Sequence, residues 1–346
     1  MIILSIETSC DDTAIAIVEE KKGKTCLPAG RFKILSNIIS SQIELHKEYG
    51  GVFPSLAKRE HENNLVPVFE KALKKAKNLK IDVIAVTVGP GLDPCLWTGI
   101  NFAKSVAIEW GLPIIPVNHI EGHLLVNSID KEIKYPAIGL IVSGGHTQLI
   151  LIKGVGKYKI LGETRDDAAG ECLDKAARIL GLDYPGGPAI AKQAQGRSKT
   201  STMGLPRPMM HTKDYDFSFS GLKTAVLYNF KKQSPKVRKS EEYIQSMCFE
   251  IQQSVIDVLI KKTMKAVKDY EVRTLILGGG VSANKELRSQ FKKVLKSKSP
   301  NTKYLIPDTK YSTDNAVMIA IAGYYNRAKK TKNYSKIKAK PNLRIK

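Results

Sequence analysis

Two short stretches that lie far apart in this sequence follow the same pattern, and their likeness limits the folds open to the chain. Leu4–Val18 (LSIETSCDDTAIAIV) aligns with Ile138–Ile152 (IGLIVSGGHTQLILI), so that Ser9 falls on Ser143. Each copy is an apolar strand, a small polar turn and a second apolar strand, which is the pattern of a β-hairpin. The repeat therefore predicts two related lobes that face one another.

Apolar strands alternate with helical patterns along the rest of the chain, which indicates α/β architecture. The expected strands are Ile2–Ile6, Ala14–Val18, Val83–Val88, Ile114–Val117, Ile138–Val142, Gln148–Ile152 and Thr274–Leu277. The expected helices cover 55–78, 97–110, 119–128, 168–181, 241–269, 283–297 and 314–330.

A glycine-rich turn follows the last of these strands. In LILGGGVSANKELR (275–288) the strand leads into Gly278–Gly280, and Ser282 is placed to cap the next helix. A helix N-terminus beside such a turn favours an anion or a nucleotide. The motif is neither GxGxxG nor a Walker A sequence, which argues against dinucleotide-binding and P-loop folds. Together with the two polar hairpins it resembles the plan of actin, the sugar kinases and Hsp70, known as the ASKHA fold.

That resemblance gives the expected fold class: α/β, a two-lobed ASKHA fold with a duplicated mixed-sheet core and an inter-lobe cleft. The N-terminal lobe is expected at 1–133 and is completed by a C-terminal helix at about 315–330. The second lobe is expected at 134–314, and residues 331–346 are predicted to be a flexible basic tail.

The net charge of +22, from 55 Lys and Arg against 33 Asp and Glu, suits a polyanionic partner such as a nucleic acid. A proteome that is rich in lysine throughout explains the same surplus. Basic residues cluster at 231–239, 292–298 and 327–346. Five scattered cysteines without a CxxC pair indicate a reducing compartment. With no signal-peptide pattern and no long uncharged stretch, we expect a cytoplasmic protein without membrane contact.

Two histidines in the stretch NHIEGHLL point to a metal. His119 and His123 are four residues apart, so on a helix they lie on one face and can share an ion. In the zinc protease motif HExxH the glutamate directly follows the first histidine and acts as the base. Glu121 is instead displaced by one position, about 200° around the helix from His119, which argues against a protease. A structural pair of histidines is the plain alternative.

A third ligand is needed, and Asp314 is the best candidate. Thr313, Asp314 and Asn315 open an apolar helix, so the carboxylate projects from a helix start. The alternative for Asp314 is an ordinary N-cap. His146 in SGGHTQ is a second candidate ligand, or a phosphate contact.

Taken together, the motifs resemble those of the TsaD family of tRNA threonylcarbamoyladenosine synthases, in its bacterial form. The matching stretches run in the family's order from residue 2 to about 322: IETSCDDTAIAI, YGGVFPSLAKREH, GPGL, NHIEGHLL, LIVSGGHTQLI, DDAAGECLDKAARILGLDYPGGP, LPRPM, DFSFSGLKTAV, GGGVSAN and STDNAVMIA.

The resemblance implies an acyltransferase that moves threonylcarbamoyl from threonylcarbamoyl-AMP to N6 of adenosine 37, beside the anticodon of tRNAs that read ANN codons. It implies that His119, His123 and Asp314 bind one divalent metal, iron by family expectation with zinc as the second choice. Asp11 corresponds to an acid proposed to be catalytic, and a hydrogen-bonding turn residue is its plain alternative. The residues expected to hold the adenylate are Ile141, Val142, Ser143, Gly144, Gly145, Asp174, Gly187 and Asn284.

The same resemblance implies the partners: tRNA, a TsaB-like paralogue and a TsaE-like ATPase. Two other functions stay open at this level, namely a small-molecule kinase and a pseudoenzyme scaffold that binds a metal and a nucleotide. The histidine pair has no evident use in a kinase, and a scaffold is expected to have lost the metal ligands. The role of Glu121 is expected to be support of the helix or of a ligand.

Overall fold

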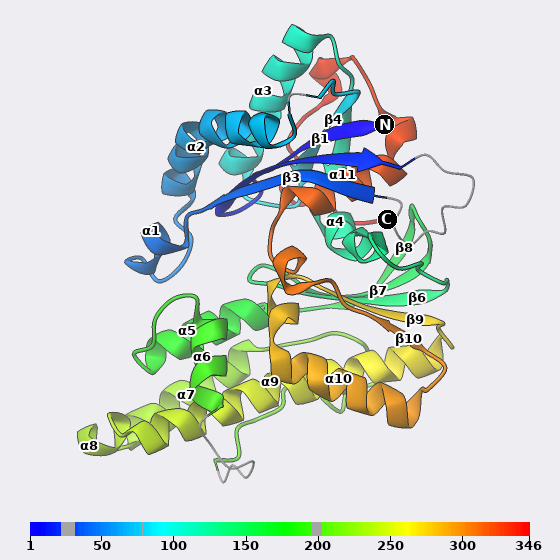
Figure 1. Ribbon diagram of the computed structural model, residues 1–346. Coiled ribbons are helices and arrows are strands. Elements are labelled where there is room, and N and C mark those ends of the chain that lie inside the picture. The colour runs from blue at the N-terminus through cyan, green and yellow to red at the C-terminus, as the bar shows by residue number, and fades with distance from the viewer. Residues whose placement is uncertain (22–31, 78, 196–202) are drawn as a thin grey trace. The chain divides into compact units, whose positions relative to one another are not determined.

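The computed structural model describes residues 1–21, 32–77, 79–195 and 203–346. It contains two compact units, drawn in Figure 1. Unit 1 consists of Met1–Leu45, Val52–Ile133 and Pro307–Lys346, and unit 2 consists of His46–Gly51 and Lys134–Ile306. The chain therefore returns to unit 1 at Pro307, which is earlier than the boundary at residue 314 expected from the sequence.

Unit 1 is built on a five-stranded sheet in the order β3-β2-β1-β4-β5. Strands β3, β2 and β1 are antiparallel, whereas β1, β4 and β5 are parallel. The strands are β1 (Ile2–Glu7), β2 (Asp12–Glu20), β3 (Phe32–Ser41), β4 (Val83–Gly89) and β5 (Ile114–Asn118).

Unit 2 repeats this topology, with its sheet in the order β10-β9-β6-β7-β8. Here β6, β7 and β8 are antiparallel, and β6, β9 and β10 are parallel. The two hairpins end in corresponding pairs, Glu7 with Ala14 and Val142 with Thr147. The duplicated mixed sheet predicted from the repeat is thereby confirmed. The strands are β6 (Ala137–Val142), β7 (Thr147–Gly154), β8 (Lys157–Glu163), β9 (Thr274–Gly278) and β10 (Lys303–Leu305).

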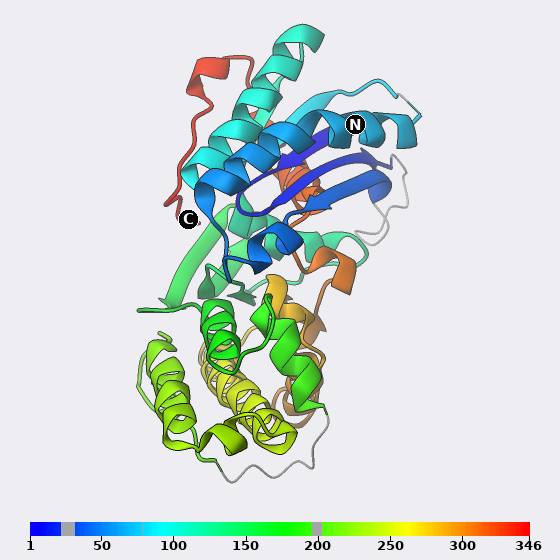
Figure 2. The same cartoon turned by 90° about the vertical axis from the view of Figure 1, so that its left-hand side faces the viewer.

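Helices cover both faces of the unit 1 sheet. Successive side chains of β1 point to opposite faces. Leu4 and Ile6 pack against the core with α2 (Pro54–Lys75) and α3 (Asp93–Trp110), which run side by side in Figure 2. On the other face the Ser5 hydroxyl donates to the carbonyl of Ala316 (2.6 Å) at the start of α11 (Ala316–Tyr325). Because α11 is apolar all round, it can only be stable when buried, and nearly all of it is.

Most of the remaining helices belong to unit 2. They surround a core formed by the sheet and by α9, whose 29 residues make it the longest helix of the described chain. The helices are α5 (Ala169–Ile179), α6 (Gly186–Ala194), α7 (Ser220–Lys232), α8 (Pro235–Arg238), α9 (Glu241–Asp269) and α10 (Lys285–Lys298). The short helix α1 (Ile43–Lys47) spans the boundary of the two units.

Each strand predicted from the sequence is present, and α9 has the predicted ends. Other helix ends differ: α3 begins at Asp93 because Pro94 suits a first helical turn, and the predicted 314–330 helix is α11 followed by a 3-10 turn at Arg327–Lys329. Residue 78, the expected end of α2, and Cys26 lie outside the described residues. Elements that the sequence did not predict are α1, β3, β8, α6, α7, α8 and β10.

The C-terminal segment that we expected to be a flexible tail packs onto unit 1 instead. Thr331 pairs with Ile114, and the backbone N–H of Lys340 donates to the Val88 carbonyl (2.7 Å). The Tyr334 hydroxyl donates to the carbonyl of Leu112 (2.7 Å), and the Ile337 side chain is buried. Apolar residues spaced between the lysines therefore anchor the segment while its cations stay in solvent.

The cysteines Cys10, Cys95, Cys172 and Cys248 are free thiols. No helix in the described part of the chain combines the length and the apolar character needed to cross a bilayer.

Candidate metal centre and substrate-binding turns

The histidine pair lies on α4 (His119–Leu125), which begins directly after β5. Asn118 caps this helix by accepting a hydrogen bond from the backbone N–H of Glu121 (3.1 Å). His119 and His123 lie on one face, edge to face with ring centroids 4.7 Å apart, and their exposed fractions are only 6% and 1%. The helix and the shared face predicted from the spacing are both present.

Asp314 joins the histidines from the segment before α11. Its Oδ1 lies 3.5 Å from His119 Nε2 and 3.2 Å from His123 Nε2. The N-cap of α11 is Asn315, whose side chain accepts from the backbone N–H of Met318 (3.1 Å). The N-cap alternative for Asp314 is therefore wrong, and its carboxylate faces the two imidazoles.

The three side chains fit a divalent transition metal. Each offers one ligand atom, and these atoms lie within 4.8 Å of one another. Two imidazole nitrogens and one carboxylate are a donor set that both iron and zinc accept, and it leaves further coordination positions open. A single ion can thus satisfy three polar groups that are otherwise crowded together.

Glu7 is a member of this cluster that the sequence did not single out. It ends β1, its side chain is fully buried, and Oε2 lies 3.1 Å from His119 Nδ1. Burial would raise the pKa of Glu7, but the charge and hydrogen bond of His119 lower it below its usual value. Burial would likewise lower the pKa of His119, yet Asp314 and Glu7 raise it to about 9. The signal in the sequence is a charged residue at the end of a mostly apolar strand.

Glu121 points to another part of unit 1. Its Oε2 accepts a hydrogen bond from Asn326 Nδ2 (2.7 Å), just beyond the end of α11. Glu121 therefore ties α4 to the C-terminal end of α11, in agreement with the expected supporting role and with the argument against a protease.

Asp11 lies in the β1–β2 turn, where its backbone carbonyl accepts from the N–H of Gln42 (3.0 Å). Burial, then Asp11, then Asp314 raise the pKa of the neighbouring Cys10 thiol well above its usual value. The carboxylates of Asp11 and of the metal-site residue Asp314 thus act on the same thiol. This places Asp11 in the electrostatic neighbourhood of the candidate metal centre.

His61 of α2 contacts this turn through both of its ring nitrogens. Its Nε2 lies 3.0 Å from the carbonyl oxygen of Cys10, and its Nδ1 lies 2.7 Å from the Thr13 hydroxyl. Because a carbonyl can only accept, Nε2 carries the proton and Nδ1 accepts from Thr13. The sequence motif YGGVFPSLAKREH contains His61, but nothing in its spacing revealed this contact.

The β6–β7 turn contains the expected phosphate-binding glycines. The Ser143 N–H donates to the His146 carbonyl (2.8 Å), and the Ser143 hydroxyl accepts from the His146 N–H (3.1 Å). Gly144 and Gly145 are exposed, and a Cβ on either would meet nothing within 4 Å. Their backbone is therefore open to a ligand, while Ile141 and Val142 are buried in β6. His146 is in this turn in unit 2 and is not part of the described metal cluster.

The other expected substrate residues lie around this turn or at helix starts of unit 2. Gly170 N–H in α5 donates to the Ser143 carbonyl (3.1 Å), and Gly279 of the glycine turn approaches Val142 so closely that a Cβ would lie 2.5 Å from its carbonyl oxygen. The hairpin, α5 and the glycine turn therefore meet at one end of the sheet.

Asp174 lies within α5, Gly187 in the first turn of α6, and Asn284 at the N-cap of α10. Asp174 Oδ1 accepts from the N–H of Gly186 (2.7 Å), which sets it beside Gly187 in the first turn of α6. Asn284 caps α10 by accepting from the Leu287 N–H (3.0 Å). Ser282, the cap expected from the sequence, is in the 3-10 turn before it.

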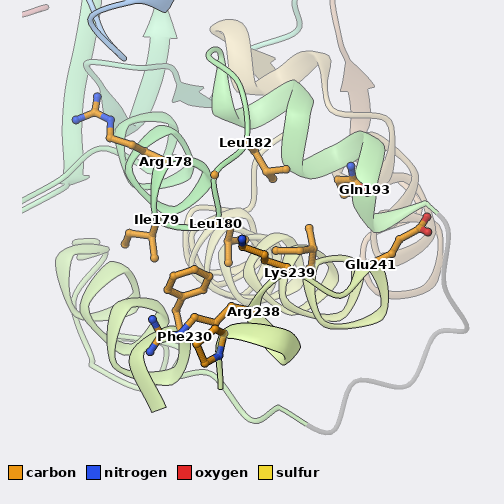
Figure 3. A pocket seen from close by; sticks show the side chains of 12 residues that line it. Arg178, Ile179, Leu180, Leu182, Gln193, Phe230, Arg238, Lys239 and Glu241 are labelled. Atoms are coloured by element: carbon orange, nitrogen blue, oxygen red, sulfur yellow. The ribbon is translucent and has the colours of Figure 1, made fainter. Parts of the chain in front are cut away.

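Unit 2 also contains a pocket of about 670 Å³, between the C-terminal end of α5 and helices α6 to α9 (Figure 3). The guanidinium of Arg238 lies over the Phe230 ring (5.2 Å), and Lys239 and Glu241 also line the pocket. Arg238 Nε is buried and has no hydrogen-bond partner among the described residues. None of the site residues predicted from the sequence is among the residues that line this pocket.

The fold is shared with solved structures of HypF. The HypF of T. kodakarensis matches with a TM-score of 0.63 over 94% of this chain, at 13% sequence identity, and full-length HypF in a phosphate- and nucleotide-bound form matches with a TM-score of 0.62. This chain spans about half of those longer proteins (48% and 46%). Fold and site together define an ASKHA-type α/β protein with a candidate two-histidine, one-carboxylate metal centre.

Sequence comparison identifies the family within that class. The model for TsaD, tRNA N6-adenosine threonylcarbamoyltransferase, matches residues 33–321. Proteins of that name from Thermosipho africanus and Syntrophomonas wolfei are 47% and 43% identical to this chain, over 100% and 99% of it and 100% and 97% of their own lengths. The chain belongs to the TsaD family.

Proposed function

We propose that this chain transfers a threonylcarbamoyl group to N6 of an adenosine in tRNA. The observation that carries the proposal is the convergence of His119, His123 and Asp314 on one point, within a chain that matches the TsaD family along its length. The donor is threonylcarbamoyl-AMP, and the acceptor is adenosine 37 in tRNAs that read ANN codons.

The metal proposed for these three residues is iron, as the family resemblance implies, with zinc as the second candidate; both accept two imidazoles and a carboxylate. When bound, it supplies a Lewis acid that can orient and polarise the threonylcarbamoyl donor. His119 and His123 bind through neutral nitrogens, so each ring must be free of a proton on its ligating atom.

The hairpin Ile141–Gly145 holds the phosphate of the adenylate, and its two exposed glycines support this role because their N–H groups are accessible. Asp174 and Gly187, which lie together at the start of α6, are proposed to contact the ribose or the base. The Asn284 side chain already bonds to Leu287 and Gln252, so it reaches the ligand with its remaining N–H or lone pair.

Asp11 is proposed to orient or deprotonate the attacking exocyclic amine. AMP is a good leaving group, so the remaining chemistry is proton removal and stabilisation of charge on the carbamoyl oxygen. The turn that carries Asp11 is fixed by His61, which favours a residue held in one position.

A TsaB-like paralogue and a TsaE-like ATPase are the proposed protein partners, and the cytoplasm is the proposed location. Exposed apolar side chains on adjacent helices offer a surface for the paralogue: Phe53 precedes α2, Val66 is 52% exposed on α2, and Ile108 is 64% exposed on α3. No observation favours a kinase or an inactive scaffold.

The test is a reconstituted reaction. Purified protein is incubated with threonine, bicarbonate, ATP, the adenylate-forming enzyme and unmodified tRNA, with and without the two partner proteins, and modified nucleoside is measured by mass spectrometry. We expect product with the complete mixture and its loss with His119→Ala. Product formation by His119→Ala at the wild-type rate, or no product from the complete wild-type mixture, would contradict the proposal.

A further inference from the structure

We propose that Glu7 is a positioning residue for the metal centre: it holds the Nδ1 proton of His119 and thereby directs Nε2 toward the metal. The inference rests on the metal centre of the proposed function and adds to it a residue outside the ligand set. It follows from the contacts of one buried carboxylate.

Both oxygens of Glu7 accept hydrogen bonds. Oε1 accepts from the Ser9 backbone N–H (2.6 Å), and Oε2 accepts from the Thr87 hydroxyl (2.6 Å). His119 Nδ1 lies 3.1 Å from the same Oε2. The donors come from three places in the fold, namely the β1–β2 turn, β4 and the start of α4.

This arrangement fixes which atom of His119 carries the proton. The side chain of Glu7 is 0% exposed, and a carboxylate withdrawn from water is stable only when neighbouring groups donate to it. Nδ1 must therefore be the donor, because the lone pair of an unprotonated Nδ1 would face a lone pair of Glu7 Oε2. The Ser9 hydroxyl, 3.1 Å from Nδ1, is placed to share that proton.

In the neutral imidazole that metal binding requires, the lone pair left on Nε2 points at the candidate metal site. Nε2 is the atom that lies near Asp314 Oδ1 (3.5 Å), where the ligand atoms of His123 and Asp314 also converge. A carboxylate that accepts from the far nitrogen of a ligating imidazole fixes its orientation and makes it a stronger donor. Glu7 occupies that position.

The second ligand lacks such support. His123 Nδ1 is buried and has no hydrogen-bond partner among the described residues. Within the described chain the two histidines are therefore unequal, and the orienting carboxylate acts on His119 alone.

The chain offers a matched control in Glu121. Both glutamates are buried in unit 1, but Glu121 bonds to Asn326, whereas Glu7 contacts the imidazole of His119. Changing either to Gln removes one buried charge and keeps the shape, and of the two only Glu7 has a described hydrogen bond to a candidate ligand. Thr87→Val is a milder probe, because it removes one donor to Glu7 and retains the carboxylate.

The experiment measures the affinity for Zn²⁺ by titration calorimetry against a competing chelator, using the full-length protein after metal removal. We expect Glu7→Gln to bind Zn²⁺ about 10- to 100-fold more weakly than wild type, Thr87→Val to lose a few-fold, and Glu121→Gln to stay within about 3-fold. Thermal unfolding of each metal-free variant shows that it is folded.

A second readout reports the hydrogen bond itself. In the zinc-loaded protein the Nδ1 proton of His119 is expected to give a downfield NMR signal, which moves upfield in Glu7→Gln and stays in place in Glu121→Gln. Wild-type affinity and an unmoved signal in Glu7→Gln would overturn the role of Glu7, as would equal losses in both glutamine variants. Unchanged affinity in His119→Ala would instead overturn the metal centre, and the role of Glu7 with it.

Discussion

Asp12 directly follows Asp11, and its surroundings disfavour the charged form of its carboxylate. Burial raises its pKa to about 7, the hydrogen bond with Ser41 opposes the shift, and the charge of Asp11 adds to it. One of its oxygens, Oδ1, is buried without a partner among the described residues. The folded protein therefore holds a proton on Asp12 at pH values where the unfolded chain has released it.

The sign of the pH effect follows from the raised pKa. Between pH 4 and 7 the unfolded state loses the proton and the folded state keeps it, so stability falls as pH rises through this window. We expect Asp12→Asn to stabilise the metal-free protein by up to about 4 kcal/mol at pH 8 and by little at pH 4. Urea unfolding at both pH values measures this, and an equal gain at both would contradict the shifted pKa.

His61 supports the β1–β2 turn through two hydrogen bonds. His61→Leu leaves the Cys10 carbonyl and the Thr13 hydroxyl without these partners in a buried place. We expect a loss of about 2–4 kcal/mol in unfolding free energy, at roughly 1–3 kcal/mol for each unsatisfied group.

The activity of His61→Leu should also fall, because the turn carries Asp11. Asn64→Ala is a suitable comparison on the same helix, since its contacts are with Ser40 and Glu60 and not with the turn. If Asn64→Ala lowered activity as much as His61→Leu, the support of Asp11 by His61 would not be the cause.

Residue-level prediction from the sequence works where a spacing implies a shared face. His119 and His123 are an example; Asp314 was a candidate from its place at a helix start, and the resemblance to a family supported it. Glu7 and His61 escape such reasoning because their partners come from other strands and helices, and burial of a charged or polar side chain is decided only by tertiary packing.

At the level of elements, α11 shows how closely a helix can approach a sheet. A Cβ built on Gly323 would lie 2.7 Å from the Cβ of Ala85 in β4, and alanine cannot move aside by rotating a side chain. Glycine is needed here for space rather than for an unusual backbone angle.

Gly323→Ala is therefore expected to push α11 away from β4 and to lower the unfolding free energy by about 1–3 kcal/mol. The start of the same helix follows Asp314, so a smaller loss of Zn²⁺ affinity should accompany it. Gly154→Ala is a suitable control, because a Cβ at Gly154 would meet open space. Gly156→Ala is not, because Gly156 has a positive φ (74°). A melting temperature equal to that of Gly154→Ala would contradict the packing argument.

The elements missed by sequence analysis share physical reasons. β8 (KYKILGE) lies at a sheet edge, where charged residues are tolerated and weaken the apolar pattern. β10 has only three residues, and α6 begins with Gly-Gly-Pro, which reads as a turn. Buried central strands such as β4 and β9 were predicted because their apolar runs are continuous.

For the whole molecule, the charge of +22 matters most if it is concentrated where tRNA binds. The basic cluster at 231–239 borders the pocket of Figure 3, which Arg238 and Lys239 help to line. The cluster at 292–298 on α10 carries similar charge without lining this pocket.

Replacing Lys236, Arg238 and Lys239 by Gln is expected to weaken tRNA binding by about 10-fold and to reduce the slope of log K against log salt by about 2 to 3. Replacing Lys292, Lys293 and Lys296 removes the same charge and is expected to have a smaller effect. Filter binding at several salt concentrations measures both, and equal losses would mean that only net charge counts.

The return of the chain to unit 1 at Pro307 has a consequence for protein synthesis. Most of unit 2 is contiguous, from Lys134 to Ile306, so it can fold while the ribosome is still translating. Unit 1 must wait for α11 and for the segment that pairs with β5. Asp314 is made long after the two histidines, so the third candidate metal ligand becomes available only after unit 2 has been translated. A chain that stops before Asp314 lacks the complete candidate ligand set, so this site can form only after synthesis of unit 2.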